Sequence, residues 1–61
     1  MTEEEARALC DTVERLPGWW ADYWPGENGH YYVLAWSEND EEQVYPLRNL
    51  RDWEALMEGD G

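Results

Sequence analysis

The chain has 61 residues and a formal net charge of -11, because 15 acidic residues stand against only four arginines. This length supports one domain and leaves little room for an enzyme pocket with its supporting side chains, so we expect a protein without catalytic activity. Hydrophobic residues make up 43% of the chain, which argues against a disordered acidic tail, and the single cysteine excludes a disulfide framework and a multi-cysteine zinc site.

Residues 2–16 are predicted to form a helix. Thr2 is a typical helix N-cap, and Glu5 three positions later completes a T-x-x-E capping box. Apolar residues recur at helical spacing, with Cys10 beside them, and form a stripe that we expect to be buried: Ala6, Leu9, Val13 and Leu16. Pro17 and Gly18 then end the helix.

A β-hairpin is predicted after this helix. Trp19–Trp24 forms its first strand and His30–Ser37 its second, since both are rich in aromatic and β-branched residues. The Asn28-Gly29 pair between them tolerates the positive φ angles of a tight turn. Alternation along the second strand places Tyr32, Leu34 and Trp36 on one face, and Tyr31, Val33 and Ala35 on the other.

A third strand and a second helix follow. The polar turn Glu38–Glu41 leads to a short strand over Glu42–Tyr45, and Pro46, which lacks a backbone donor, indicates that this strand lies at an edge or ends there. Asn49 is the expected N-cap of a helix over residues 49–58. Its apolar stripe consists of Leu50, Trp53, Leu56 and Met57. We expect the tail Gly59-Asp60-Gly61 to be frayed.

The element order α-β-β-β-α predicts the fold class. We expect a single α+β domain over residues 1–61, in which a three-stranded antiparallel sheet packs against both helices on one face. The sequence contains no internal repeat and no linker.

Charge is the most informative feature for function. A compact domain of this length has a diameter of about 27 Å, and duplex DNA carries about 16 phosphate charges over the same length. The 15 carboxylates therefore approach the charge density of DNA, and we expect a basic protein surface as the partner, not nucleic acid itself. The candidate binding carboxylates are Glu38, Asp40, Glu41 and Glu42, followed by Asp11, Glu14, Asp22 and Glu27.

The tryptophans and tyrosines suggest a second contact surface. Trp36 and Trp53 are expected in the core, whereas the adjacent Trp19 and Trp20 cannot both point inward along a strand. One sheet face is therefore predicted to expose aromatic side chains that include Tyr23, Tyr31 and Tyr45. The aromatic candidates for partner binding are Trp20, Trp24 and Tyr31. There are two alternatives for these aromatic residues. A homodimer buries the row, or the residues fill a small core with bulky groups.

Other residue patterns predict no further site. His30 has no nucleophile or paired carboxylate at a useful spacing, and Cys10 is expected to be a buried structural thiol. The Glu38–Glu42 run lacks the spacing and the glycine of a calcium loop, so we expect no metal and no cofactor. The absence of a long apolar run and of a signal-peptide pattern predicts a cytoplasmic protein that is not bound to a membrane.

Acidic positions spread over the whole chain, including Thr2–Glu5 and Glu38–Glu42, give it a compositional resemblance to a known class of proteins. The chain resembles the small phage-encoded DNA mimics, among them the anti-CRISPR proteins. The resemblance implies an inhibitor that occupies the DNA-binding groove of a CRISPR effector or of another nucleic-acid-binding protein. It carries no motif, so it implies no role for any single residue.

Two other classes of function stay open. One is a small interaction subunit or immunity-type protein, monomeric or homodimeric, that uses an exposed aromatic sheet face. The other is a domain that is acidic only because it is adapted to high salt. Substitutions at aromatic residues, charge reversals and stability in low salt would distinguish these classes from a DNA mimic.

Overall fold

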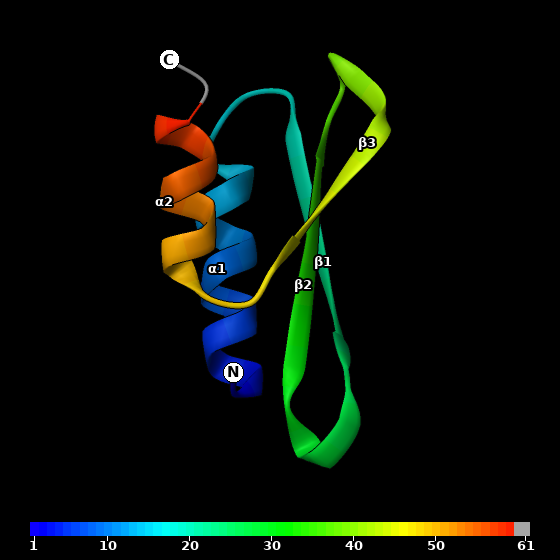
Figure 1. Cartoon of the computed structure of the whole chain (residues 1–61), viewed down its shortest axis with the longest axis vertical. Helices are drawn as coiled ribbons and strands as arrows, with labels where there is room; N and C mark the ends of the chain where they lie inside the picture. The colour runs from blue at the N-terminus through cyan, green and yellow to red at the C-terminus, as the bar shows by residue number, and fades with distance from the viewer. Residues whose placement is uncertain (60–61) are drawn as a thin grey trace.

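The computed structural model describes residues 1–59 and, at Glu41, the backbone only. The predicted elements are present in the predicted order (Figure 1). They are α1 (Glu3–Glu14), β1 (Trp19–Pro25), a short 3-10 turn η1 (Glu27–Gly29), β2 (Tyr31–Ser37), β3 (Asp40–Leu47) and α2 (Leu50–Glu58). The α-β-β-β-α fold of a small α+β domain is thereby confirmed. Of the tail predicted to be frayed, Gly59 caps α2, its N–H donating to the Ala55 carbonyl at 2.8 Å, and Asp60 and Gly61 lie outside the described residues.

Helix α1 begins at the predicted capping box. The Thr2 hydroxyl accepts a hydrogen bond from the Glu5 backbone N–H at 3.2 Å, and the Glu5 carboxylate accepts one from the Thr2 N–H at 2.9 Å. The helix ends at Glu14, two residues earlier than predicted. Leu16 therefore lies outside the buried stripe, with 39% of its surface exposed, because Pro17 stops the helix before Leu16 can turn toward the sheet.

The three strands form an antiparallel meander in the order β1-β2-β3. In the β1–β2 hairpin Trp20 lies opposite Trp36 and Trp24 lies opposite Tyr32. Asn28 and Gly29 at its tip both adopt positive φ, 59° and 76°, as the Asn-Gly pair predicted.

Strand β3 is longer than predicted. It spans Asp40–Leu47, so the polar turn before it shortens to Glu38 and Asn39. Pro46 is accommodated inside the strand, opposite Leu34, because β3 pairs on one side only. The strand therefore continues past Pro46 to bring Leu47 into the core.

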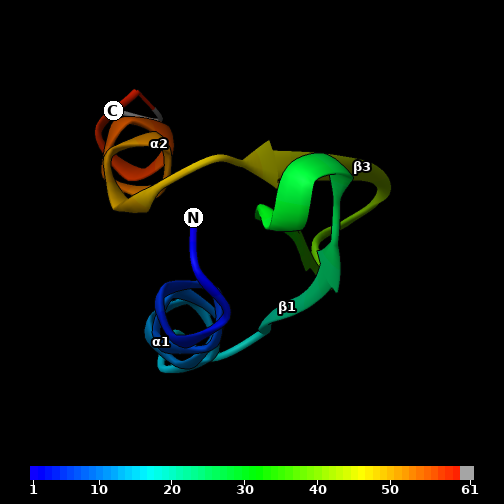
Figure 2. The ribbon, with the colours of Figure 1, turned by 90° about the horizontal axis from the view of Figure 1, so that it is seen from below.

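Both helices lie on the same side of the sheet, and the view along their axes shows this layering directly (Figure 2). Helix α1 packs against β1 and β2, and α2 lies next to β3. The core between these layers consists of Ala6, Leu9, Cys10, Val13, Val33, Ala35, Leu47 and Trp53.

The tryptophan prediction for the core is confirmed at one position and wrong at the other. Trp53 of α2 is 5% exposed and belongs to the core. Trp36 instead lies on the sheet face that points away from the helices, in register with Trp20. Its neighbours Ala35 and Ser37 face the helices and are buried, because these small side chains let α1 approach the sheet closely.

The second helix also differs from its prediction at one residue. Asn49 caps α2 as expected, its side-chain oxygen accepting from the Asp52 N–H at 3.0 Å. Leu56 and Met57 are partly buried against the core. Leu50, at the first position of the helix, is 51% exposed, because it lies at the mouth of the groove between the helices and not over the sheet.

Candidate functional site

The sheet face that no helix covers is built from alternate residues of the three strands. We call this surface the aromatic face, and it consists of Trp20, Trp24, Tyr32, Leu34, Trp36 and Pro46. Three of its aromatic members are well exposed: Trp20 at 43%, Trp24 at 37% and Tyr32 at 44%. A contiguous group of exposed aromatic side chains is typical of a surface that binds another molecule.

The rings of the aromatic face are ordered across the strands. Trp24 and Tyr32 stack with their ring centroids 5.7 Å apart and their planes 25° from parallel. Trp20 and Trp36 form another outward pair in the same hairpin, and Asp22 and Leu34 lie between the two aromatic pairs. The result is two cross-strand pairs of aromatic residues on one sheet face, and Val44 of β3 is also exposed.

Asp22 brings a carboxylate to the edge of the aromatic face. It lies on β1 between Trp20 and Trp24 in sequence, on an edge strand, and is exposed. Its Oδ1 accepts a hydrogen bond from the Tyr23 backbone N–H at 2.9 Å, which fixes the carboxylate along the strand. By register, Asp22 lies opposite Leu34 on β2, between the Trp20–Trp36 and Trp24–Tyr32 pairs.

Tyr31 was predicted for this surface, and the structure places it on the opposite face. It packs against the core beside Tyr23, with ring centroids 6.0 Å apart, and its N–H donates to the Met1 carbonyl at 2.8 Å. Tyr23 and Tyr45 likewise face the helices and are partly buried. The aromatic row therefore exists, but Tyr32 and Trp36 take the places expected for these tyrosines.

The charges of three carboxylates of the second predicted set act on Cys10. Burial of the thiol, followed by the charges of Asp22, Glu14 and Asp11, raises the pKa of Cys10 to about 11. The thiol is therefore protonated at neutral pH and does not act as a nucleophile. Glu27, the fourth member of the set, lies far from them at the tip of the β1–β2 hairpin.

The first predicted set lies at the β2–β3 hairpin. The Glu38 N–H donates to the Gly18 carbonyl at 2.9 Å, which brings Glu38 next to the loop after α1. Asp40 accepts a hydrogen bond from the Tyr45 hydroxyl at 3.4 Å, and Glu42 is exposed. The side chain of Glu41 lies outside the described residues.

The ends of both helices add to the negative charge at this end of the molecule. Helices α1 and α2 run in the same direction and end on the side of the β2–β3 hairpin (Figure 1). Neither has a basic residue in its last turn. The negative ends of both helix dipoles therefore lie at the same end of the molecule as Glu38 and Asp40.

Among the residues that the structure describes, Arg48 and Arg7 interact with other groups of the chain. Arg48 pairs with Asp52, with Nε and Oδ2 3.1 Å apart, and this hydrogen bond raises the pKa of Arg48 and lowers that of Asp52. A hydrogen bond to the Tyr23 hydroxyl raises the pKa of Arg7. These contacts do not change the net negative charge of the protein.

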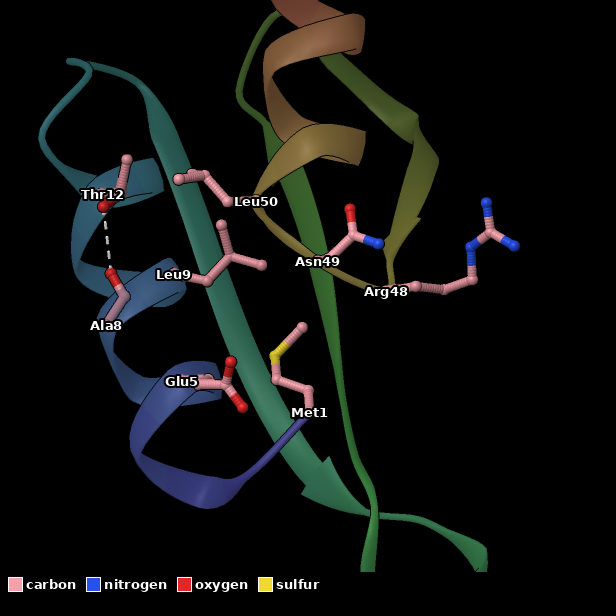
Figure 3. A pocket seen from close by; sticks show the side chains of 8 residues that line it. All are labelled: Met1, Glu5, Ala8, Leu9, Thr12, Arg48, Asn49 and Leu50. Carbon is pink, nitrogen blue, oxygen red and sulfur yellow. Dashed lines mark hydrogen bonds between the residues drawn. The ribbon is translucent and has the colours of Figure 1, made fainter.

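A groove of about 500 Å³ lies between α1 and α2, on the helical side of the molecule (Figure 3). Met1, Leu9 and Leu50 supply its apolar walls. Its polar groups already bind within the chain: Glu5 in the capping box, Arg48 to Asp52, and the Thr12 hydroxyl to the Ala8 carbonyl at 3.0 Å. The groove therefore lacks the converging polar groups of a typical small-molecule site.

Comparisons with known proteins add no relative. No family model matched the sequence, and no curated protein and no solved structure was found to be similar to the chain. Within residues 1–59, no helix is long and apolar enough to cross a membrane. The part of the chain that the structure describes contains no group of three or more His, Cys, Asp or Glu side chains that is placed to hold a metal ion.

Proposed function

We propose that this protein is an acidic inhibitor that binds the basic groove of a nucleic-acid-binding protein and blocks access of DNA. The observation that carries this proposal is the density of charge along the molecule. The chain has 15 carboxylates over a longest dimension of 34 Å. Duplex DNA presents about 20 phosphate charges over that length, so the two charge densities are comparable.

The mechanism follows from the chemistry of carboxylates. Asp and Glu accept the same charge-assisted hydrogen bonds from Arg and Lys that phosphates accept. Glu38, Asp40 and Glu42, reinforced by two helix C-termini, give one end of the molecule a strongly negative surface. This end enters the groove first, and long-range attraction speeds association.

The resemblance to anti-CRISPR proteins suggests the kind of partner. The target is a basic groove on a CRISPR effector complex in the cytoplasm of a bacterial host, and the inhibitor binds it without touching DNA. The chain has few cations, and one of them, Arg48, is already paired with Asp52. Little positive charge is therefore left to bind DNA itself.

A second candidate function is favoured by the aromatic face. Trp20 and Tyr32 are each more than two-fifths exposed, which is unusual for side chains of this size in an isolated domain. A small interaction subunit or immunity-type protein would use this face for a permanent complex. In that case, substitutions of aromatic residues would weaken binding more than charge reversals do.

The test is capture of partners from a bacterial lysate, with and without competing duplex DNA. The proposal expects a nucleic-acid-binding protein that duplex DNA displaces. A variant with Glu38, Asp40, Glu41 and Glu42 changed to Lys should lose this partner while its circular dichroism spectrum stays unchanged.

A matched control makes the same change in net charge at the other end of the molecule and along α2. It reverses three exposed glutamates outside the candidate set to Lys, namely Glu3, Glu4 and Glu54, and is compared with the reversal of Glu38, Asp40 and Glu42. This control should retain more of the partner than that reversal does. If the first variant captures the partner as well as the original chain does, charge mimicry at the hairpin end is wrong.

A further inference from the structure

We propose that the aromatic face and Asp22 together form a binding surface for arginine side chains of the partner protein. This inference deepens the proposed function and rests on its class of partner, a basic protein. It assigns a role to the one large surface that charge mimicry alone leaves unused.

The geometry of the rings suits a guanidinium group. This group is planar and weakly hydrated, so it stacks on the faces of indole and phenol rings, with Trp the best partner. Trp24 and Tyr32 lie 25° from parallel and expose 37% and 44% of their surfaces on adjacent strands. Because the two rings stack on each other, each has one face turned away from its partner ring, and a guanidinium group can stack there.

Asp22 supplies the charge that such a stacked cation needs. It follows Trp20 and precedes Trp24 by two residues each, on the same edge strand. Its Oδ1 is held by the Tyr23 N–H, so the carboxylate loses little freedom when a ligand binds. A carboxylate accepts the paired N–H groups of one guanidinium, and its oxygens have lone pairs beyond the one that Tyr23 uses.

Charge complementarity selects a basic partner over a second copy of the chain. Two copies that meet through the aromatic face bring together two formal charges of -11, and Asp22 lies at the edge of that contact. The same groups attract a surface rich in arginine. The occupant is therefore a basic protein surface, with apolar contact to the rings and ion pairs at Asp22.

Arginine is distinguished from lysine by this arrangement. The lysine ammonium is a compact and strongly hydrated charge, which neither stacks flat on a ring nor binds a carboxylate in the paired geometry. A purely electrostatic surface would bind both residues equally. Selectivity for arginine is thus the signature of the aromatic face.

The experiment titrates the intact protein with two peptides of equal length and charge, one alternating glycine with arginine and the other glycine with lysine. Tryptophan fluorescence or calorimetry reports binding. We expect the arginine peptide to bind roughly tenfold more tightly, which corresponds to about 1.4 kcal/mol. Equal affinities for the two peptides would overturn the inference.

Two variants test whether the preference for the arginine peptide arises at the aromatic face. Asp22→Asn keeps an oxygen that can accept from Tyr23 but removes the charge, and Trp24→Leu removes a ring from an exposed position. Both should reduce the preference for arginine severalfold, whereas Glu54→Gln on α2, which also removes one charge, should leave it unchanged. If the three variants behave alike, the aromatic face does not bind arginine.

Further outcomes separate this inference from the proposed function. A preference for arginine without any DNA-displaceable partner leaves the inference standing and refutes inhibition of DNA binding. A DNA-displaceable partner whose affinity is unchanged by Asp22→Asn and Trp24→Leu supports the inhibitor and refutes the arginine surface. A dimer by light scattering that these two variants dissociate also refutes it, since a second copy then covers the face.

Discussion

The indole of Trp53 meets the indole of Trp19 edge-on, with ring centroids 5.1 Å apart and an interplanar angle of 80°. Trp53 is the one residue of α2 that is buried, and Trp19 opens β1 on the helical side of the sheet. This contact joins α2 to β1. The two elements are distant in the topology, because α2 follows β3, and β3 and β1 lie at opposite edges of the sheet. Together with Leu56 and Met57, which pack against the core, this pair holds α2 in place.

Replacement of Trp53 by Ala should destabilise the protein by about 3–5 kcal/mol, because a large buried aromatic side chain is lost and a cavity is left. For a domain of this size, that loss approaches the whole free energy of unfolding. Urea unfolding followed by circular dichroism measures the effect. Trp53→Phe is the control and should cost less. A loss below about 1 kcal/mol for Trp53→Ala would show that α2 is not held in this way.

The capping box of α1 should contribute measurably to stability. Thr2→Ala removes the hydroxyl that accepts from the Glu5 N–H, and we expect a loss of about 1 kcal/mol. Thr12→Ala is the matched control, since the Thr12 hydroxyl donates to the Ala8 carbonyl within the helix and caps nothing. Thermal unfolding of the two variants side by side checks the difference. Equal losses would argue against a specific role for the cap.

The pair formed by Arg48 and Asp52 predicts a pH dependence. The side-chain hydrogen bond from Arg48, with a second bond from its backbone N–H, lowers the pKa of Asp52 below its ordinary value of 3.8. A carboxyl with a lowered folded-state pKa stabilises the fold above its unfolded pKa and loses this effect as the pH falls through the folded value.

Comparison with Asp52→Asn isolates this effect from the other carboxylates. The difference in free energy of unfolding between the original chain and the variant should be constant above about pH 5 and should narrow below pH 3.8. Urea unfolding at a series of pH values provides the measurement. A difference that stays constant down to pH 2 would mean that the charge of Asp52 contributes nothing.

The net charge of -11 predicts how the fold responds to salt. Repulsion among carboxylates destabilises the compact state and is screened by added ions, so the melting temperature should rise with sodium chloride. A DNA mimic should nevertheless be folded in dilute buffer. A chain that is unfolded there and folds only in molar salt would instead be acidic through adaptation to salt.

Local signals in the sequence were sufficient to predict the helices and the order of the strands. The helix starts are predicted by capping side chains that act over three residues, namely Thr2, Glu5 and Asn49. The hairpin is predicted in the same local way by the Asn28-Gly29 pair. Such signals do not depend on the rest of the fold, which is why they could be predicted.

The composition of the aromatic face could not be predicted from the same signals. Alternation correctly divides β2 into two sets, but it does not say which set faces the helices. That choice depends on the fit of α1 against Ala21 and Ala35, which is a tertiary effect. Trp36 was therefore expected in the core and Tyr31 on the surface, and both predictions were wrong.

The central claim is that this protein and DNA compete for one basic surface. The most direct measurement is fluorescence anisotropy of labelled duplex DNA bound to the captured partner, titrated with this protein. We expect full displacement of the DNA, weakened by salt and lost in the variant with Glu38, Asp40, Glu41 and Glu42 changed to Lys. DNA that stays bound while this protein also binds the partner would contradict the claim.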